Sequence, residues 1–143
     1  MCVVNAYPRY VEEGFQLYDP LALMQLTEEV VCRGDARKYT AFYCTGVYGG
    51  IATGYTVGCC LRCIFCWVDA SRDFPETHGE FYTPAQVASR LIGIARRKRV
   101  PRLRISSGEP TLGKRHLLGV LKHIEPVGYE FIPETNGIPI AAF

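Results

Sequence analysis

The sequence predicts an α/β fold with parallel strands, and three observations indicate it. Residues 51–57 are rich in apolar and β-branched residues, as a buried strand is. In residues 83–99, apolar side chains recur at three- and four-residue steps, which indicates an amphipathic helix. A second short apolar stretch follows Pro101. A strand, a helix and a strand in succession imply a right-handed crossover within a parallel sheet.

Composition and charge are those of an ordinary globular protein. The 143 residues are 48% hydrophobic and 21% charged, which is enough chain for one domain. The net charge of +2 does not indicate nucleic-acid binding, since the basic run at residues 96–99 comes at a predicted helix end, where cations suit the dipole. The N-terminus lacks a secretory pattern, and no apolar run reaches membrane-spanning length. With an odd count of seven cysteines, we expect a cytoplasmic protein with reduced thiols and no membrane partner.

The N-terminal third is predicted to hold one helix and one strand. Residues 1–18 have no steady period and suggest an irregular lead-in. Asp19-Pro20 is a helix start signal, because aspartate caps the first turn and proline fits its first position. The apolar face continues to Arg33, and Gly34 is expected to end the helix. Residues 38–48 are rich in aromatic, threonine and valine residues and suit an extended strand.

Strands and helices then alternate through the rest of the chain. The strand at 51–57 leads into a cysteine-rich loop, where Gly58 permits a turn that a Cβ would obstruct. Residues 68–82 suggest a polar connection with turn residues. Thr83-Pro84 caps the helix that ends near Arg99.

A second helix and two short strands complete the predicted order. Residues 103–106 and 129–133 suggest strands, and residues 116–124 suggest a helix with an apolar face. His116 and His123 lie on this helix, and we expect both to be partly exposed structural residues.

The loop after the first of these strands carries the densest chemistry in the chain. It holds four cysteines within eight residues and is followed by the only tryptophan, Trp67. Cys59, Cys63 and Cys66 have C-x3-C-x2-C spacing, and a short loop of this kind can curl three thiolates around one metal centre. Thiolates are the ligands of iron–sulfur clusters. Because such a cluster takes four ligands, three thiolates leave one iron open.

Two other uses of these cysteines stay open at this stage. Cys60, Cys63 and Cys66 also form C-x2-C-x2-C, so Cys60 could replace Cys59 as a ligand. A C-x2-C pair is also half of many structural zinc sites. A zinc-binding structural domain is therefore an alternative, although no second ligand pair follows Cys66.

Two further motifs follow the later predicted strands. They are Ser107-Gly108-Glu109-Pro110 and Glu134-Thr135-Asn136-Gly137. Each alone is a common loop sequence. Three motifs at the carboxyl ends of three successive strands are different, because that rim is where α/β barrels build active sites.

Together these motifs resemble those of the radical S-adenosylmethionine (SAM) superfamily, whose cluster loop has the same cysteine spacing with an aromatic residue, here Phe65, before the last cysteine. The resemblance implies a 4Fe–4S cluster on Cys59, Cys63 and Cys66, with SAM chelating the open iron. It also implies that SAM is reductively cleaved to a 5′-deoxyadenosyl radical, which abstracts hydrogen from a substrate. The substrate is unknown. A ferredoxin- or flavodoxin-like electron donor is the expected partner.

The resemblance also assigns the cofactor contacts. Many members carry Gly-Gly-Glu-Pro where this chain has Ser107 to Pro110, and there the motif engages the methionyl amino group. We expect a serine to be accommodated at Ser107 if its φ is negative. Phe65 is expected near the adenine. The implied cofactor-binding residues are Phe65, Trp67, Ser107, Gly108, Glu109, Pro110, Thr135 and Asn136.

Finer similarities point in several directions and leave the substrate open. Cys66-Trp67 is similar to the wyosine-type tRNA-modifying branch, and residues 134–137 are similar to glycyl-radical activating enzymes. Residues 37–51 resemble a group of uncharacterised iron–sulfur oxidoreductases.

The superfamily core is a partial barrel of six βα units, so the resemblance implies a half TIM-type barrel of about three units. We expect residues 1–50 to form an N-terminal extension of a short helix and strand. Residues 51–143 then form the first half of the barrel, apparently truncated or completed by a partner chain. A non-catalytic iron–sulfur carrier and an inactive fragment are the alternatives to an enzyme.

Overall fold

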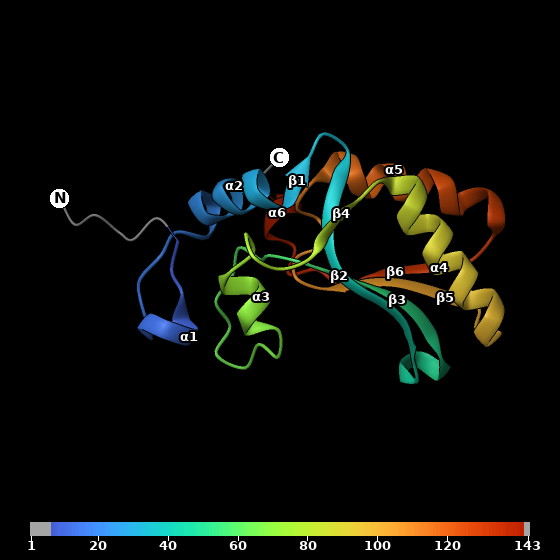
Figure 1. Ribbon diagram of the computed structural model, residues 1–143, viewed down its shortest axis with the longest axis horizontal. Coiled ribbons are helices and arrows are strands. Elements are labelled where there is room, and N and C mark those ends of the chain that lie inside the picture. The colour runs from blue at the N-terminus through green and yellow to red at the C-terminus, as the bar shows by residue number, and fades with distance from the viewer. Residues whose placement is uncertain (1–6, 142–143) are drawn as a thin grey trace.

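The computed structural model describes residues 7–141 and contains one mixed sheet with helices packed on it (Figure 1). The helices are α1 (Tyr10–Glu13), α2 (Pro20–Val31), α3 (Asp69–Asp73), α4 (Pro84–Lys98), α5 (Lys114–Ile124) and α6 (Ile138–Ala141), with short 3-10 turns η1 (Val47–Gly49) and η2 (Glu125–Val127). The strands are β1 (Cys32–Arg33), β2 (Ala36–Thr45), β3 (Ile51–Thr56), β4 (Glu80–Tyr82), β5 (Arg102–Ser107) and β6 (Glu130–Pro133).

The sheet confirms the predicted fold class. Its strand order is β1-β2-β3-β5-β6, with β4 paired to the other edge of β2. β3, β5 and β6 are parallel neighbours, as strands joined by helical crossovers are expected to be. β2 runs antiparallel to β1, β3 and β4. The result is a curved α/β half barrel, which corresponds to a partial TIM-type barrel.

The strongest sequence signals give the best-placed helices. Thr83 and Gln86 form a reciprocal capping box at the start of α4, as its predicted start requires. α4 and α5 lie side by side against one face of the sheet (Figure 1). Their buried side chains join those of the strands in one core. That core comprises Tyr39, Ala52, Val87, Ala88, Leu91, Ile94, Ala95, Leu103, Ile105, Val120 and Ile124.

Helix α2 begins as predicted but does not end at Gly34. The Asp19 side chain accepts a hydrogen bond from the Leu21 N–H, and Pro20 occupies the first helical position. The helix stops at Val31 because the chain passes directly into the β1–β2 hairpin. Gly34, with a φ of 62°, lies in the turn of that hairpin. The glycine therefore marks a strand turn and not a helix end.

Two regions predicted to be irregular contain regular structure. The lead-in includes α1, and the connection at residues 68–82 includes α3 and β4. β4 forms because its backbone pairs with β2, more than 35 residues earlier in the chain. Local composition carries no signal for such a pairing.

His116 is buried, which corrects the expectation of partial exposure, whereas His123 is exposed. The Nδ1 atom of His116 lies 2.7 Å from the carbonyl oxygen of Asp35, and the Nε2 atom of His116 lies 2.9 Å from the hydroxyl of Tyr39. A carbonyl only accepts, so Nδ1 carries the proton and Nε2 accepts from Tyr39. Burial lowers the pKa of His116 to about 4, and the Arg37 charge acts in the same direction.

Within residues 7–141, no helix combines the length and the apolar character needed to cross a bilayer.

The lowered pKa of His116 predicts a specific loss of stability in acid. An unfolded histidine protonates below pH 6.5 whereas the folded one stays neutral to about pH 4, so stability falls as the pH drops between these values. His116→Asn keeps a donor for the Asp35 carbonyl and removes the titration. We expect the wild-type free energy of unfolding to fall by up to about 3 kcal/mol more than that of the variant. Urea denaturation at pH 7 and pH 4.5 measures the difference, and parallel pH curves would contradict it.

Candidate functional site

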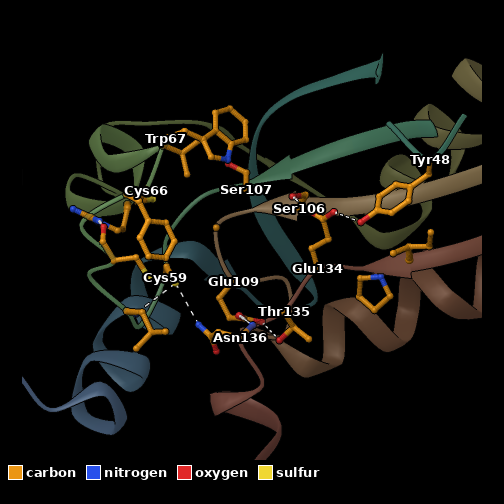
Figure 2. Close-up of a pocket in the computed structure, with 18 residues that line it drawn as sticks. Tyr48, Cys59, Cys66, Trp67, Ser106, Ser107, Glu109, Glu134, Thr135 and Asn136 are labelled. Carbon is orange, nitrogen blue, oxygen red and sulfur yellow. Dashed lines mark hydrogen bonds between the residues drawn. The ribbon is translucent and has the colours of Figure 1, made fainter. Parts of the chain in front are cut away.

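One cavity of about 700 Å³ opens at the carboxyl ends of β3, β5 and β6 (Figure 2). The turns that follow all three strands line it, as expected for an α/β barrel rim. The predicted site residues that line it are Cys59, Cys63, Phe65, Cys66, Trp67, Ser107, Gly108, Glu109, Thr135 and Asn136. Pro110 and Cys60 are buried and are not among the lining residues.

Gly58 sets the entry to the cysteine loop, as predicted. Its φ of 87° is in the left-handed region that favours glycine. An added Cβ would lie 2.7 Å from the side chain of Thr27 and 2.9 Å from that of Val31. The loop therefore leaves β3 in close contact with α2.

Gly108 joins the turn after β5 to the cysteine loop. Its N–H donates to the Thr56 carbonyl at 3.0 Å, and the Glu109 N–H donates to the Gly58 carbonyl at 2.8 Å. A Cβ on Gly108 would overlap the backbone of Gly58. The two turns thus approach so closely that only glycine fits between them.

Ser107 adopts a φ of 85°, so the negative φ on which we made the tolerance of a serine conditional is not what the structure has. Its Oγ is buried and has no hydrogen-bond partner among the described residues. A non-glycine residue in this region is strained, and a buried hydroxyl without a partner is destabilising. Serine therefore occupies a glycine-type position next to the cavity and leaves one polar atom unused.

The Glu109 carboxylate ties the turn after β5 to the turn after β6. Its Oε1 accepts from the Thr111 N–H at 3.0 Å and from the hydroxyls of Thr111 and Thr135. Its Oε2 accepts from the Asn136 N–H at 2.8 Å. Among the described residues, Oε1 therefore accepts three hydrogen bonds and Oε2 accepts one.

A buried arginine on β2, Arg37, hydrogen-bonds to the turns that follow β3 and β5. The Arg37 side chain is fully buried, and it donates to the carbonyls of Val57, Glu109 and Leu112 at 2.8, 3.1 and 2.6 Å. Burial lowers the pKa of Arg37. Nothing in the local sequence distinguished this arginine from the other basic residues.

Asn136 brings the third turn into contact with the cysteines. Its Nδ2 lies 3.5 Å from the Cys59 sulfur (Figure 2). The same nitrogen lies 3.6 Å from the Cys60 sulfur. The hydrogen bond between the two neighbouring thiols, followed by burial, raises the pKa of Cys59. The same hydrogen bond lowers the pKa of Cys60.

The cysteines supply a donor set that suits an iron–sulfur cluster, without a preformed metal site. Cys59, Cys63 and Cys66 are half-buried free thiols on the wall of one cavity. In the described part of the chain, no three His, Cys, Asp or Glu side chains stand together closely enough to hold a metal ion. Three soft thiolates fit the cluster chemically. The three cysteine side chains have to turn toward one another to form the centre.

Glu134 lines the cavity and pairs with Arg104 behind it, an ion pair that the sequence pattern did not predict. Glu134 Oε1 accepts from the Tyr48 hydroxyl, and Ser106 donates to the other carboxylate oxygen (Figure 2). Arg104 Nη1 lies 3.1 Å from the same Oε1. Burial alone would raise the pKa of Glu134, but the Ser106 hydrogen bond and the Arg104 charge lower it. The one available signal was a charged residue two positions before Ser106, which places both on one face of β5.

Aromatic side chains on the sheet pack behind Trp67, which lines the cavity. Tyr55 stacks on Tyr43 at a centroid separation of 4.3 Å, and Trp67 meets Tyr55 edge-on at 6.0 Å. Burial, followed by interaction with Tyr43, raises the pKa of Tyr55 to about 12. Phe65 is 85% exposed, so nearly all of its ring is free to contact a ligand.

Because Gly58 and Gly108 lie so close together, we expect one methyl group added at residue 108 to lower the stability of the fold strongly. Gly108→Ala should lower the free energy of unfolding by at least about 2 kcal/mol, because the Cβ overlaps backbone atoms that cannot rotate away. Gly93→Ala in α4 is the matched control, since its Cβ would meet only the end of the Arg97 side chain at 3.4 Å. Helix propensity makes that change neutral or stabilising. Equal denaturation midpoints for the two variants would show that the turns do not depend on this contact.

Comparison with known proteins gives one family. The family model described as the Radical SAM superfamily matches residues 54–142, more than half of the chain and all three motif turns. A search of curated proteins found no match. The finer similarities to wyosine-type, activating-enzyme and uncharacterised oxidoreductase groups therefore stay predictions. The cysteine spacing, the shared cavity and the match to the family model together show that the chain belongs to the radical SAM superfamily.

Proposed function

We propose that the protein is a radical SAM enzyme that binds a 4Fe–4S cluster and SAM in the cavity at the strand ends. One observation carries the proposal: the turns after β3, β5 and β6 line a single cavity and are hydrogen-bonded to one another. Membership of the superfamily favours a cluster over zinc. A non-catalytic iron–sulfur carrier would need only the cysteines. Its function would not require the turns after β5 and β6 to contact the cysteine loop.

Cys59, Cys63 and Cys66 would hold the cluster, since all three line the cavity and Cys60 does not. Glu109 lines the cavity, and its Oε2, the less used of the two carboxylate oxygens, would accept from the methionyl amino group of SAM. Thr135 and Asn136 would orient the same end of the cofactor. Phe65 and Trp67, both largely exposed beside the cysteines, would contact the adenine.

Reductive cleavage of bound SAM supplies a 5′-deoxyadenosyl radical that abstracts hydrogen from the substrate. The chain's own part is to orient the cofactor and to exclude water from the cavity. The Glu134 carboxylate and the Tyr48 hydroxyl, which both line the cavity, are the polar groups that would contact a substrate, with Arg104 pairing Glu134.

The proposed reaction needs an electron donor and a reducing environment. A ferredoxin- or flavodoxin-like protein would supply the electron. All six cysteines of the described part are free thiols, which suits a compartment such as the cytoplasm, where thiols stay available to iron.

Anaerobic reconstitution with iron and sulfide, followed by SAM and a strong reductant, tests the function directly. We expect the brown colour and spectrum of a 4Fe–4S cluster and the release of 5′-deoxyadenosine, measured by chromatography. A cluster without 5′-deoxyadenosine would favour a carrier or an inactive fragment. Protein that takes up zinc but assembles no cluster would overturn the proposal.

The choice of ligands predicts a contrast between neighbouring cysteines. Cys63→Ala removes a ligand common to both possible registers and should reduce bound iron to background. Cys60→Ala changes a side chain buried away from the cavity and should keep most of the iron. Iron and sulfide analysis after reconstitution measures both. Loss of the cluster in Cys60→Ala, with Cys59→Ala intact, would show that Cys60 is the ligand.

A further inference from the structure

The outer side of the cysteine loop is held by a buried group of charged side chains, Arg62, Arg72 and Asp73. Arg62 lies within the loop, and Asp73 ends the short helix α3 that follows it. The Arg62 and Asp73 side chains are 0% exposed, and that of Arg72 is 3% exposed. Such burial of three charges is costly unless each is paired and hydrogen-bonded.

Asp73 is the centre of the group. Its Oδ1 lies 2.7 Å from Arg72 Nε and 3.2 Å from Arg62 Nε, so one carboxylate oxygen serves both guanidinium groups. Its Oδ2 accepts from the Val11 N–H at 2.9 Å, and its carbonyl accepts from Arg9 at 2.6 Å. The aspartate is thus fixed by the N-terminal lead-in on one side and holds the two arginines on the other.

The two arginines connect Asp73 to the backbone of the cysteine loop. Arg62 Nη1 donates to the carbonyls of Cys59 and Leu61, both at 3.0 Å. Arg72 Nη1 donates to the Cys63 carbonyl at 2.9 Å. These bonds fix the backbone beside two of the three proposed ligands.

The lead-in also contacts Arg62 directly. The Arg62 Nε donates to the Pro8 carbonyl at 2.7 Å, and its backbone N–H donates to the Tyr18 hydroxyl at 2.8 Å. The Tyr7 ring lies under its guanidinium at 5.0 Å. Arg62 Nη2, however, is buried without a partner in the described part of the chain. If these three charged side chains served only to stabilise the fold, apolar side chains at the same place would do so without the cost of burying an unpaired charged donor.

We propose that Asp73 is a positioning residue for the cluster: through Arg62 and Arg72 it holds the backbone of Cys59 and Cys63 in the conformation that presents their sulfurs to the cavity. The inference rests on the proposed function, since it gives the loop geometry a purpose. It also gives a role to the side-chain contacts of a loop that has no regular structure from Val57 to Cys66. We call Asp73, Arg62 and Arg72 together the clamp, and the lead-in and α3 form its outer half.

Thiol labelling of the metal-free protein tests the clamp without requiring a cluster. Asp73→Asn keeps the shape and removes the charge that fixes both arginines. A brief iodoacetamide pulse under native conditions, read cysteine by cysteine with mass spectrometry, should show Cys59 and Cys63 labelled about tenfold faster, the factor expected for losing one charged hydrogen bond. Cys32 and Cys44 lie on β1 and β2 and serve as internal controls.

Asp69→Asn is the matched control variant. Asp69 lies on the same short helix, is exposed and undergoes the same change of charge. Its labelling rates should stay within about twofold of the wild type, as for most surface changes. The inference is wrong if Asp73→Asn leaves Cys59 and Cys63 unchanged, or if Cys32 and Cys44 accelerate equally, because the aspartate would then act on the whole fold.

Two further variants keep the inference testable if Asp73→Asn does not fold. Arg62→Lys and Arg72→Lys keep the positive charge and lose the forked donor geometry. Arg62→Lys should accelerate Cys59 more than Cys63, and Arg72→Lys should do the reverse, because each arginine holds a different carbonyl. Equal effects on both cysteines would contradict the clamp. Failure of the wild-type protein to assemble a cluster would contradict the proposed function instead and leave these labelling results unaffected.

Discussion

The Glu109 carboxylate is the interaction on which the cavity depends. It lies on the turn after β5 and accepts from Thr135 and Asn136, which follow β6. Asn136 in turn contacts the sulfurs of Cys59 and Cys60, so a single buried charge links all three motif turns. Arg37 holds the same turn from the opposite side through the Glu109 carbonyl. A buried carboxylate is tolerated here because it is surrounded by donors.

This arrangement fixes the turns after β3, β5 and β6 to one another. The cysteine loop itself is held mainly by residues that belong to none of these turns' hydrogen bonds. Backbone contacts between Gly58 and Gly108 join the first two turns, and the Glu109 hydrogen bonds join the second and third. Beyond Cys59 the cysteine loop depends on arginine side chains and on the N-terminal lead-in. The residues before α2 therefore have a structural connection to the proposed cluster site, although they lie outside the region that matches the family model.

The alternation of strands and helices, the capped start of α4 and the three motif turns could all be predicted, because each depends on local spacing. The partners of Glu109, Arg62 and Asp73 could not, because they lie on segments brought together only by the fold. β4 was missed for the same reason, since it exists through pairing with β2. The sign of the Ser107 φ was left open, because a serine carries no sequence signal for a positive value. Phe65 and Trp67 were found through the resemblance alone.

The central claim is that the three motif turns form one binding site. A crystal structure of the reconstituted protein with SAM, with iron located by its anomalous scattering, tests this most directly. We expect iron bound to the sulfurs of Cys59, Cys63 and Cys66, with the methionyl amino group of SAM hydrogen-bonded to Glu109. Iron bound elsewhere, or SAM away from the turns after β5 and β6, would contradict it.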